Sequence, residues 1–234
     1  MGSASLDFLN MIKEQEKGSV SDAGGRSETC HKTVNLHKES REEQEQVNSG
    51  ALIAVIDTET NWRDEVMSLG VALADAVTFK CVDKRYYIFE PESRIGGMYS
   101  CVMDRCDVRP ITCMRDKAMD DLGEYLVERG VTKILAYNAK FDYGHLPELA
   151  GFEWYDIMRL AAYRQFNSAI PDNLPCCRTG RLKSNFGVEP ILRMLSGDSL
   201  YTEVHNAVED AVDELRIVEL LGQKIEAYEC GRIN

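Results

Sequence analysis

Asp57 and Glu59 stand one residue apart at the end of an apolar run that begins at Ala51. Such a run is typical of a strand buried on both faces, and residues two positions apart on a strand project from the same face. Two like charges side by side at the end of a buried strand are costly unless a cation binds between them. The pair is therefore a candidate ligand set for a divalent cation. The alternative is a solvated strand end at which the chain turns.

Three further residues with acid–base chemistry follow later in the chain. Asp142 comes just after another predicted strand (132–137), and His205 and Asp210 stand at the start of a long predicted helix (206–227). The open crevice of such a sheet lies at the carboxyl ends of its strands, so we expect these side chains to gather beside the first pair. Taken singly, the two acids are explained as well by the preference of carboxylates for helix N-termini, and the histidine by surface exposure.

The predicted elements have to bring these residues together. The first three strands follow one another with short polar connections, which favours an antiparallel meander, whereas the fourth is entered through a helix and is expected to lie parallel to the first. This order predicts an α/β fold with a mixed five-stranded sheet flanked by helices. The expected strands are 51–60, 66–73, 85–89, 132–137 and 154–155, and the expected helices are 116–128, 141–149, 157–161, 188–195 and 206–227.

Composition narrows the classes of function. With 27 basic and 39 acidic residues the net charge is −12, which argues against a broad basic face that grips nucleic acid unaided. A polyanionic substrate would need local basic residues or a bound metal. The hydrophobic content of 44% is that of a soluble globular protein. The eight cysteines include no C-x-x-C pair, which favours reduced thiols over a zinc site or a disulfide framework.

Residues 1–50 differ from the rest of the chain. Their polar composition predicts a flexible N-terminal tail or linker ahead of a single domain at 51–230. The apolar cluster at 6–12 is either a segment that docks on a protein partner, such as a polymerase, or on the domain itself, or a marginal local helix. No stretch resembles a membrane span or a secretory signal, so we expect no membrane association and a cytoplasmic protein.

The order and spacing of the acids and the histidine resemble those of an enzyme family, the DEDDh or DnaQ-like 3′-to-5′ exonucleases of the ribonuclease H-like superfamily. The resemblance covers residues 51 to about 222, and the segment 179–205 is similar to exonucleases carried by phages and mobile elements of Gram-positive bacteria. Tyr137 replaces a histidine that many members have, and Asn61-Trp62 replaces the commoner Thr-Gly. The motifs that carry the resemblance are Asp57-x-Glu59, Asn138-x-x-Phe141-Asp142 and His205-x4-Asp210.

The resemblance implies a ribonuclease H-like fold and a metal-dependent 3′-to-5′ exonuclease. Such an enzyme releases nucleoside monophosphates from single-stranded or frayed 3′ ends of DNA, with RNA also open as a substrate. It implies two Mg²⁺ or Mn²⁺ ions, whose charge balances the carboxylates, and a histidine that takes the proton of the attacking water. The expected catalytic residues are this base, His205, and the metal ligands Asp57, Glu59, Asp142 and Asp210.

Residues around the three motifs are expected to contact the substrate strand. Asn138 would position the terminal nucleotide. Trp62 would stack on a base, or else it is an ordinary core or edge aromatic. Arg181 and Lys183, on a loop rich in proline and glycine, would contact phosphates or would simply be solvated. The expected substrate-binding residues are Thr58, Thr60, Trp62, Asn138, Phe141, Arg181 and Lys183.

Two other functions stay open. An RNA-trimming exoribonuclease of the same family would carry the same motifs, because contacts to a 2′-hydroxyl leave no signature in the linear sequence. A non-catalytic nucleic-acid-binding module on the same fold would be expected to lack one of the four acids or the histidine, and this chain has all five.

Overall fold

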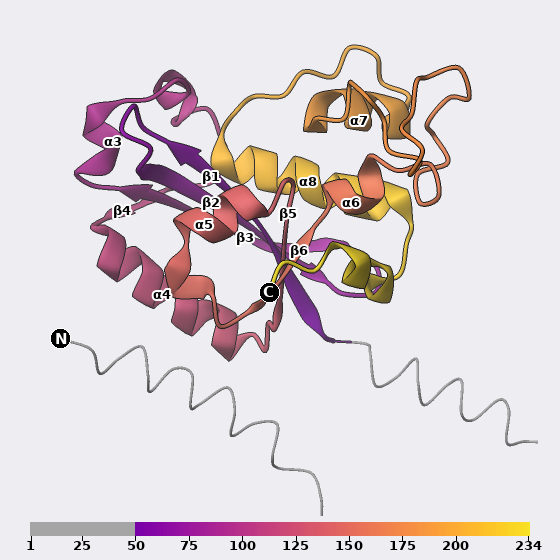
Figure 1. Ribbon diagram of the computed structural model, residues 1–234. Coiled ribbons are helices and arrows are strands. Elements are labelled where there is room, and N and C mark those ends of the chain that lie inside the picture. Colours follow the sequence, from indigo (N-terminus) through magenta and orange to yellow (C-terminus); the bar gives the residue numbers. More distant parts are fainter. Residues whose placement is uncertain (1–49) are drawn as a thin grey trace, which may run out of the picture. The chain divides into compact units, whose positions relative to one another are not determined.

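A mixed sheet of six strands forms the centre of the fold, in the order β4-β3-β2-β1-β5-β6 (Figure 1). The computed structural model describes residues 50–234, and the predictions for residues 1–49 fall outside this part. The strands are β1 (Leu52–Thr60), β2 (Val66–Asp75), β3 (Cys81–Phe89), β4 (Ile111–Cys113), β5 (Lys133–Ala136) and β6 (Glu153–Asp156). The α-helices are α3 (Glu92–Ile95), α4 (Arg115–Glu128), α5 (Lys140–His145), α6 (Met158–Ala161), α7 (Val188–Ser196) and α8 (Ala207–Leu221), and the 3₁₀ helices are η1 (Ser100–Val102), η2 (Pro147–Leu149) and η3 (Ile225–Gly231).

The strand directions follow the predicted pattern, but the number of strands does not. β1, β2 and β3 form an antiparallel meander, and β5 lies parallel to β1 and to β6. The α/β fold with a mixed sheet is therefore confirmed, whereas the prediction of five strands is wrong. The additional strand, β4, is three residues long and pairs in parallel with the end of β3. Three residues are too few to display the alternation by which a strand is recognised, so β4 depends on its pairing with β3.

Two neighbouring tyrosines show that helices cover the sheet on both faces. Successive side chains of a strand point to opposite faces. The Tyr86 ring packs against Ala207 and Val208 at the start of α8, whereas the Tyr87 hydroxyl donates a hydrogen bond of 2.6 Å to Asp121 Oδ2 on α4. The sheet thus lies between α8 on one face and α4 on the other.

Two predicted helices end earlier than expected. The helix predicted at 141–149 ends at His145, because a proline disfavours helical backbone in the residue before it, and Pro147 follows. The helix predicted at 206–227 ends where Gly222 takes a left-handed conformation with φ of 60°, which closes the last turn. The short helices η2 and η3 continue the chain beyond these two ends.

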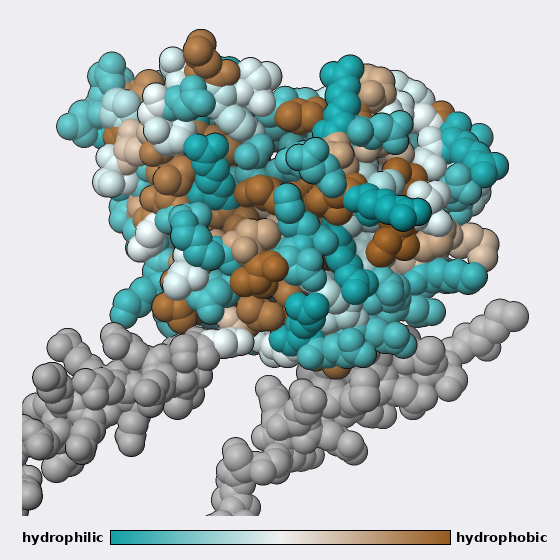
Figure 2. Space-filling model, turned by 180° about the vertical axis from the view of Figure 1, so that it is seen from behind, coloured by the Kyte–Doolittle hydropathy of each residue, from teal (hydrophilic) through white to brown (hydrophobic). Residues whose placement is uncertain are grey.

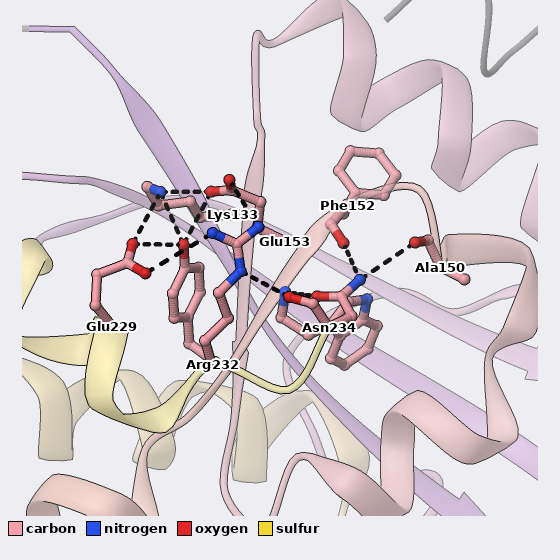
Figure 3. Close-up of polar contacts among 9 residues, drawn as sticks. Lys133, Ala150, Phe152, Glu153, Glu229, Arg232 and Asn234 are labelled. Atoms are coloured by element: carbon pink, nitrogen blue, oxygen red, sulfur yellow. Dashed lines mark hydrogen bonds and ion pairs between the residues drawn. The ribbon is translucent and has the colours of Figure 1, made fainter.

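The C-terminal segment covers the outer edge of the sheet beside β6 (Figure 3). The backbone N–H of Ile233 donates to the carbonyl oxygen of Trp154 (2.8 Å), and the Trp154 N–H donates to Asn234 Oδ1 (2.9 Å). The Arg232 guanidinium lies 3.2 Å from the Glu153 carboxylate, within the group of charged side chains drawn in Figure 3. An edge covered in this way does not offer its backbone to another chain.

The surface seen in Figure 2 carries hydrophilic side chains between small groups of hydrophobic ones. The seven cysteines of the described residues are all free, as expected for reduced thiols. Across residues 50–234, every helix is too short or too polar to cross a bilayer.

Candidate active site

Gly70 allows the start of α8 to rest directly on the sheet. It pairs with Asp57 across the β1–β2 ladder, and a Cβ atom at this position would overlap the backbone of Ala207 and Val208. Only a residue without a side chain permits so close an approach. Because Asp210 lies one turn further along α8, this contact brings it to the end of β1 that carries the first acid pair.

Asp142 reaches the same place from β5. The strand runs parallel to β1, with Leu135 beside Val55, and α5 begins a few residues after the strand ends. The Asp142 side chain is buried, and its Oδ1 accepts a hydrogen bond of 2.7 Å from Thr58 Oγ1. Thr58, an expected substrate contact, is itself buried and gives its hydroxyl to Asp142.

Glu59, His205 and Asp210 converge. Each offers one ligand atom, and these three atoms lie within 4.8 Å of one another. His205 stands on the loop before α8, as expected, with a positive φ of 59°. Asn206, which follows it, caps α8 by accepting the Val208 N–H.

Two oxygens of the cluster lack a hydrogen-bond partner within residues 50–234. These oxygens, Asp57 Oδ2 and Asp210 Oδ1, are both buried. A buried carboxylate oxygen without a partner is costly, and a cation would supply the missing interaction. Oxygen ligands of this type suit Mg²⁺ and Mn²⁺. The residues therefore fit a divalent cation.

Burial and mutual repulsion raise the pKa values of the first acid pair. The pKa of Asp57 lies well above its usual value, first because its carboxyl is buried and then because of the negative charges of Glu214, Asp142, Asp210 and Glu59. Burial, with the charges of Glu203 and Asp142, raises the pKa of Glu59 to about 8. These mutual effects place all four expected ligands in one electrostatic cluster.

The other two expected ligands behave in the same way. Burial raises the pKa of Asp142 to about 7, opposed by its hydrogen bond from Thr58. Burial, followed by the charge of Glu203, raises the pKa of Asp210 to about 8. Without a cation the cluster therefore retains protons near neutral pH, and a bound cation would favour the ionised carboxylates.

Two further acids belong to this cluster and were not expected. Glu214 lies four residues after Asp210, on the same face of α8, and its buried Oε2 accepts the N–H of Tyr137 (3.0 Å). Burial, followed by the charge of Asp142, raises the pKa of Glu214 well above its usual value. Glu203, on the loop before His205, has a pKa raised to about 7, mainly by burial. The spacing of four residues from Asp210 on a helix could have identified Glu214 as a member of the cluster. Glu203 lies on an irregular loop, where the sequence has no comparable pattern.

Asn138 is exposed where β5 ends, in a turn held by a buried acid. Its φ is positive (60°), and its N–H donates to Asp156 Oδ1 (3.0 Å), which also accepts the N–H of Met158 (3.0 Å). The turn is therefore fixed from β6, and the Asn138 side chain is presented at the carboxyl end of the sheet.

The two expected aromatic contacts lie on neighbouring elements. Trp62 is 69% exposed beyond β1, and Phe141 is 40% exposed at the start of α5. His145 joins the two elements, since its ring lies 4.4 Å from that of Phe141 and its Nε2 lies 3.2 Å from Asp64 Oδ1. Both aromatic side chains are thus available to a ligand. Thr60 is half-buried, at the irregularity that ends the pairing of β1 with β2.

The expected basic residues lie on the loop that the Tyr137 side chain contacts. The Tyr137 hydroxyl donates to the carbonyl oxygen of Phe186 (2.5 Å) on this loop. The Arg181 guanidinium lies 5.4 Å from the centre of the Phe186 ring. Lys183 is exposed on the same loop. Arg181 is therefore linked to the end of β5 through Phe186 and Tyr137, and Lys183 stands two residues further along the same loop.

Solved exonuclease structures resemble this chain, although no family model and no curated protein matches the sequence. A 3′-exonuclease, in a structure of the specific recognition of the histone mRNA stem-loop, has a TM-score of 0.54 and 13% identity, covering 95% of this chain and 81% of that one. The nuclease domain of 3′hExo, a DEDDh family member bound to rAMP, has a TM-score of 0.53 and 13% identity, covering 78% of this chain and 96% of that domain. E. coli exonuclease I with a dT13 oligonucleotide has a TM-score of 0.52 and 12% identity, covering 76% of this chain and 42% of the exonuclease. At these identities the likeness establishes a shared fold: the chain has the ribonuclease H-like α/β fold of these exonucleases.

Proposed function

We propose that this chain is a metal-dependent 3′-to-5′ exonuclease that releases nucleoside monophosphates from single-stranded or frayed 3′ ends. The observation that carries the proposal is the convergence of Glu59, His205 and Asp210 within 4.8 Å, beside buried oxygens that have no hydrogen-bond partner in the described part of the chain. A general base next to acids that fit a divalent cation can catalyse the hydrolysis of a phosphodiester. The fold shared with known exonucleases agrees with this function.

Four carboxylates would hold the metal. Asp57, Glu59, Asp142 and Asp210 suit two Mg²⁺ or Mn²⁺ ions, since two divalent cations balance four negative charges. When bound, such ions lower the pKa of water and stabilise negative charge on phosphate oxygens.

The protein's own groups position and move protons. His205 takes the proton of the attacking water, because an imidazole nitrogen is a common general base. Thr58 fixes the orientation of Asp142 through its hydroxyl. Glu214 fixes the backbone of Tyr137 where β5 ends, and this orients the turn that presents Asn138.

The substrate is a free 3′ end that enters between two sets of contacts. Trp62 and Phe141 offer exposed aromatic faces, which stack on any base. Asn138 contacts the terminal nucleotide, and Arg181 and Lys183 contact phosphates further along the strand. Because the net charge is −12, affinity depends on these local contacts and on metal.

DNA and RNA are both within this proposal. The related structures include a 3′-exonuclease with a histone mRNA stem-loop and exonuclease I with a dT oligonucleotide. An exoribonuclease that trims RNA is therefore the second candidate. The likeness of 179–205 to phage and mobile-element exonucleases of Gram-positive bacteria stays a prediction from the sequence.

The setting of the enzyme is also proposed. Residues 51–230 would form the nuclease domain of a cytoplasmic protein, and residues 1–50 would recruit a polymerase or another protein partner. Deletion of residues 1–49 should then leave hydrolysis of a free oligonucleotide unchanged.

The test is hydrolysis of 5′-labelled single-stranded DNA and RNA by the full chain with Mn²⁺, in parallel with an excess of chelator. We expect products that shorten from the 3′ end, one nucleotide at a time, in the metal reaction alone. Asp57→Asn should abolish the activity. Asp120→Asn, on the exposed side of α4, is the matched control and should retain it. Activity that survives in the Asp57 variant or in chelator would reject this site.

A further inference from the structure

The ring of Tyr99 covers one face of the His205 ring. The two centroids are 4.2 Å apart, and the planes differ by 20°. Such a stack leaves the edge of the imidazole ring free, and both ring nitrogens lie on this edge. One of these nitrogens lies within 4.8 Å of the ligand oxygens of Glu59 and Asp210. We propose that Tyr99 is a positioning residue that fixes the plane of the His205 ring. This inference rests on the proposed function, in which His205 is the general base.

The loop that carries His205 is held in a conformation that it would not keep alone. A residue with a side chain seldom adopts a φ of 59°, and it does so where its surroundings hold it. The holding contacts come from the next residue, Asn206. Its Nδ2 donates to the carbonyl oxygens of Val102 and Met103, both at 3.0 Å, and its Oδ1 accepts the N–H of Val208. The histidine loop is thus bonded to the segment that carries the stacking tyrosine.

The same segment is tied to the end of β1. A Cβ atom at Gly97 would overlap the carbonyl oxygen of Thr60, the residue after Glu59. The Trp62 N–H donates to the carbonyl oxygen of Gly96 (3.0 Å). Residues 96–103 therefore connect the acid end of β1 with the histidine loop, and they fix the position of one relative to the other.

Charge supports the same role. When His205 takes a proton from water it becomes a cation, and the face of an aromatic ring attracts a cation. The negative charges of the cluster also act on Tyr99, since its pKa is raised by burial and then by the charges of Glu59, Glu203 and Asp210. Tyr99 thus covers a face of the base, while an edge nitrogen of the imidazole meets Glu59 and Asp210.

Steady-state hydrolysis of a labelled single-stranded oligonucleotide with Mn²⁺ tests the effect on turnover. Tyr99→Leu removes the stacking ring, and we expect kcat to fall about 10- to 100-fold with KM changed less than about twofold. Tyr99→Phe keeps the ring and should restore at least half of the wild-type kcat. Cys101→Ser, an exposed position on the same segment, is the matched control and should not differ from wild type. Full kcat in Tyr99→Leu would overturn the inference.

Proton NMR of the histidine rings tests the stack without any turnover. The chain has four histidines, so the signal of His205 is assigned as the one missing in His205→Gln. A proton stacked over a tyrosine face is shifted upfield; the shift should be present in wild type and Tyr99→Phe, and absent in Tyr99→Leu. A His205 signal at the unshifted position in wild-type protein would overturn the inference even if the leucine variant does not fold. A wild-type chain that hydrolyses no substrate, yet shows the upfield signal, would reject the nuclease and keep the stack.

Discussion

Thr58 Oγ1 donates a hydrogen bond of 2.7 Å to Asp142 Oδ1, and both side chains are buried. The bond joins β1 to α5 across 84 residues of sequence. It also opposes the rise in the pKa of Asp142 that burial causes, because it favours the ionised form of the carboxyl. One hydroxyl therefore fixes the orientation of a candidate metal ligand and favours its charged state.

Thr58→Val should separate the hydroxyl from the shape of the side chain. The variant leaves a carboxyl oxygen of Asp142 buried without its donor, so the free energy of unfolding should fall by about 1–3 kcal/mol. Metal affinity should fall about 10- to 100-fold, as is typical when a partner of a ligand is removed. Calorimetric titration with Mn²⁺ and denaturant unfolding measure the two effects. Thr132→Val, at an exposed position before β5, is the control; equal effects of both substitutions would contradict the role of the hydroxyl.

Gly70→Ala should displace the first turn of α8. The new methyl group would overlap the backbone of Ala207 and Val208, and a shift of about 1 Å in a positioned catalytic group costs about 100-fold in rate. We expect nuclease activity to fall by at least that factor and the melting temperature to fall as well. Gly144→Ala, where the new Cβ would meet none of the described residues beyond its own helix within 4 Å, is the matched control and should leave the fold and the rate unchanged. An active Gly70→Ala enzyme would show that α8 does not need this contact.

The acids at strand ends could be predicted because local pattern decides them. Asp57 and Glu59 follow a continuous apolar run, and Asp142 follows a second strand that the helix before it forces to be parallel. Given those directions, the carboxyl ends of both strands must meet at one edge of the sheet. The position of Asp210 could be predicted from the start of a long amphipathic helix alone.

Tyr99 and Glu203 could not be predicted, because both lie in segments without periodicity. The contact of Tyr99 with His205 depends on how residues 96–103 pack on the end of β1, and this is a tertiary property. For the same reason β4 could not be predicted from the sequence, since it is formed by pairing with β3. What the sequence lacks at these positions is any local preference strong enough to specify the contact.

The stability of the cation-free protein should fall as the pH rises. In the folded chain the pKa values are about 8 for Glu59 and Asp210 and about 7 for Asp142, whereas in the unfolded chain they are near 4. Between about pH 4 and pH 8 the folded state therefore binds more protons than the unfolded state, and the free energy of unfolding decreases with pH in that window. Melting temperatures in chelator should be lower at about pH 8 than at about pH 5.5.

Mn²⁺ should reverse this trend, because a cation that displaces the protons stabilises the ionised carboxylates. The rise in melting temperature on adding Mn²⁺ should be largest near pH 8. Asp210→Asn is the control, since it removes one shifted carboxyl and should flatten the dependence in chelator. A melting temperature in chelator that increases from pH 5.5 to pH 8 would contradict the raised pKa values, whatever the activity of the protein.

Two substitutions of Glu214 should have opposite effects, because this residue combines a repulsive charge with a useful hydrogen bond. Its charge is the largest electrostatic contribution, after burial, to the raised pKa of Asp57, and its Oε2 accepts the N–H of Tyr137. Glu214→Gln removes the charge and keeps an acceptor of the same shape, so the melting temperature in chelator at pH 8 should rise. Glu214→Leu removes the acceptor too and leaves a buried N–H without a partner, which should cost about 1–3 kcal/mol of stability. Thermal melts of the two variants beside wild type measure the difference. If glutamine destabilises the protein as much as leucine does, the charge of Glu214 is not a repulsive contribution in the cation-free protein, which would contradict the role assigned to it here.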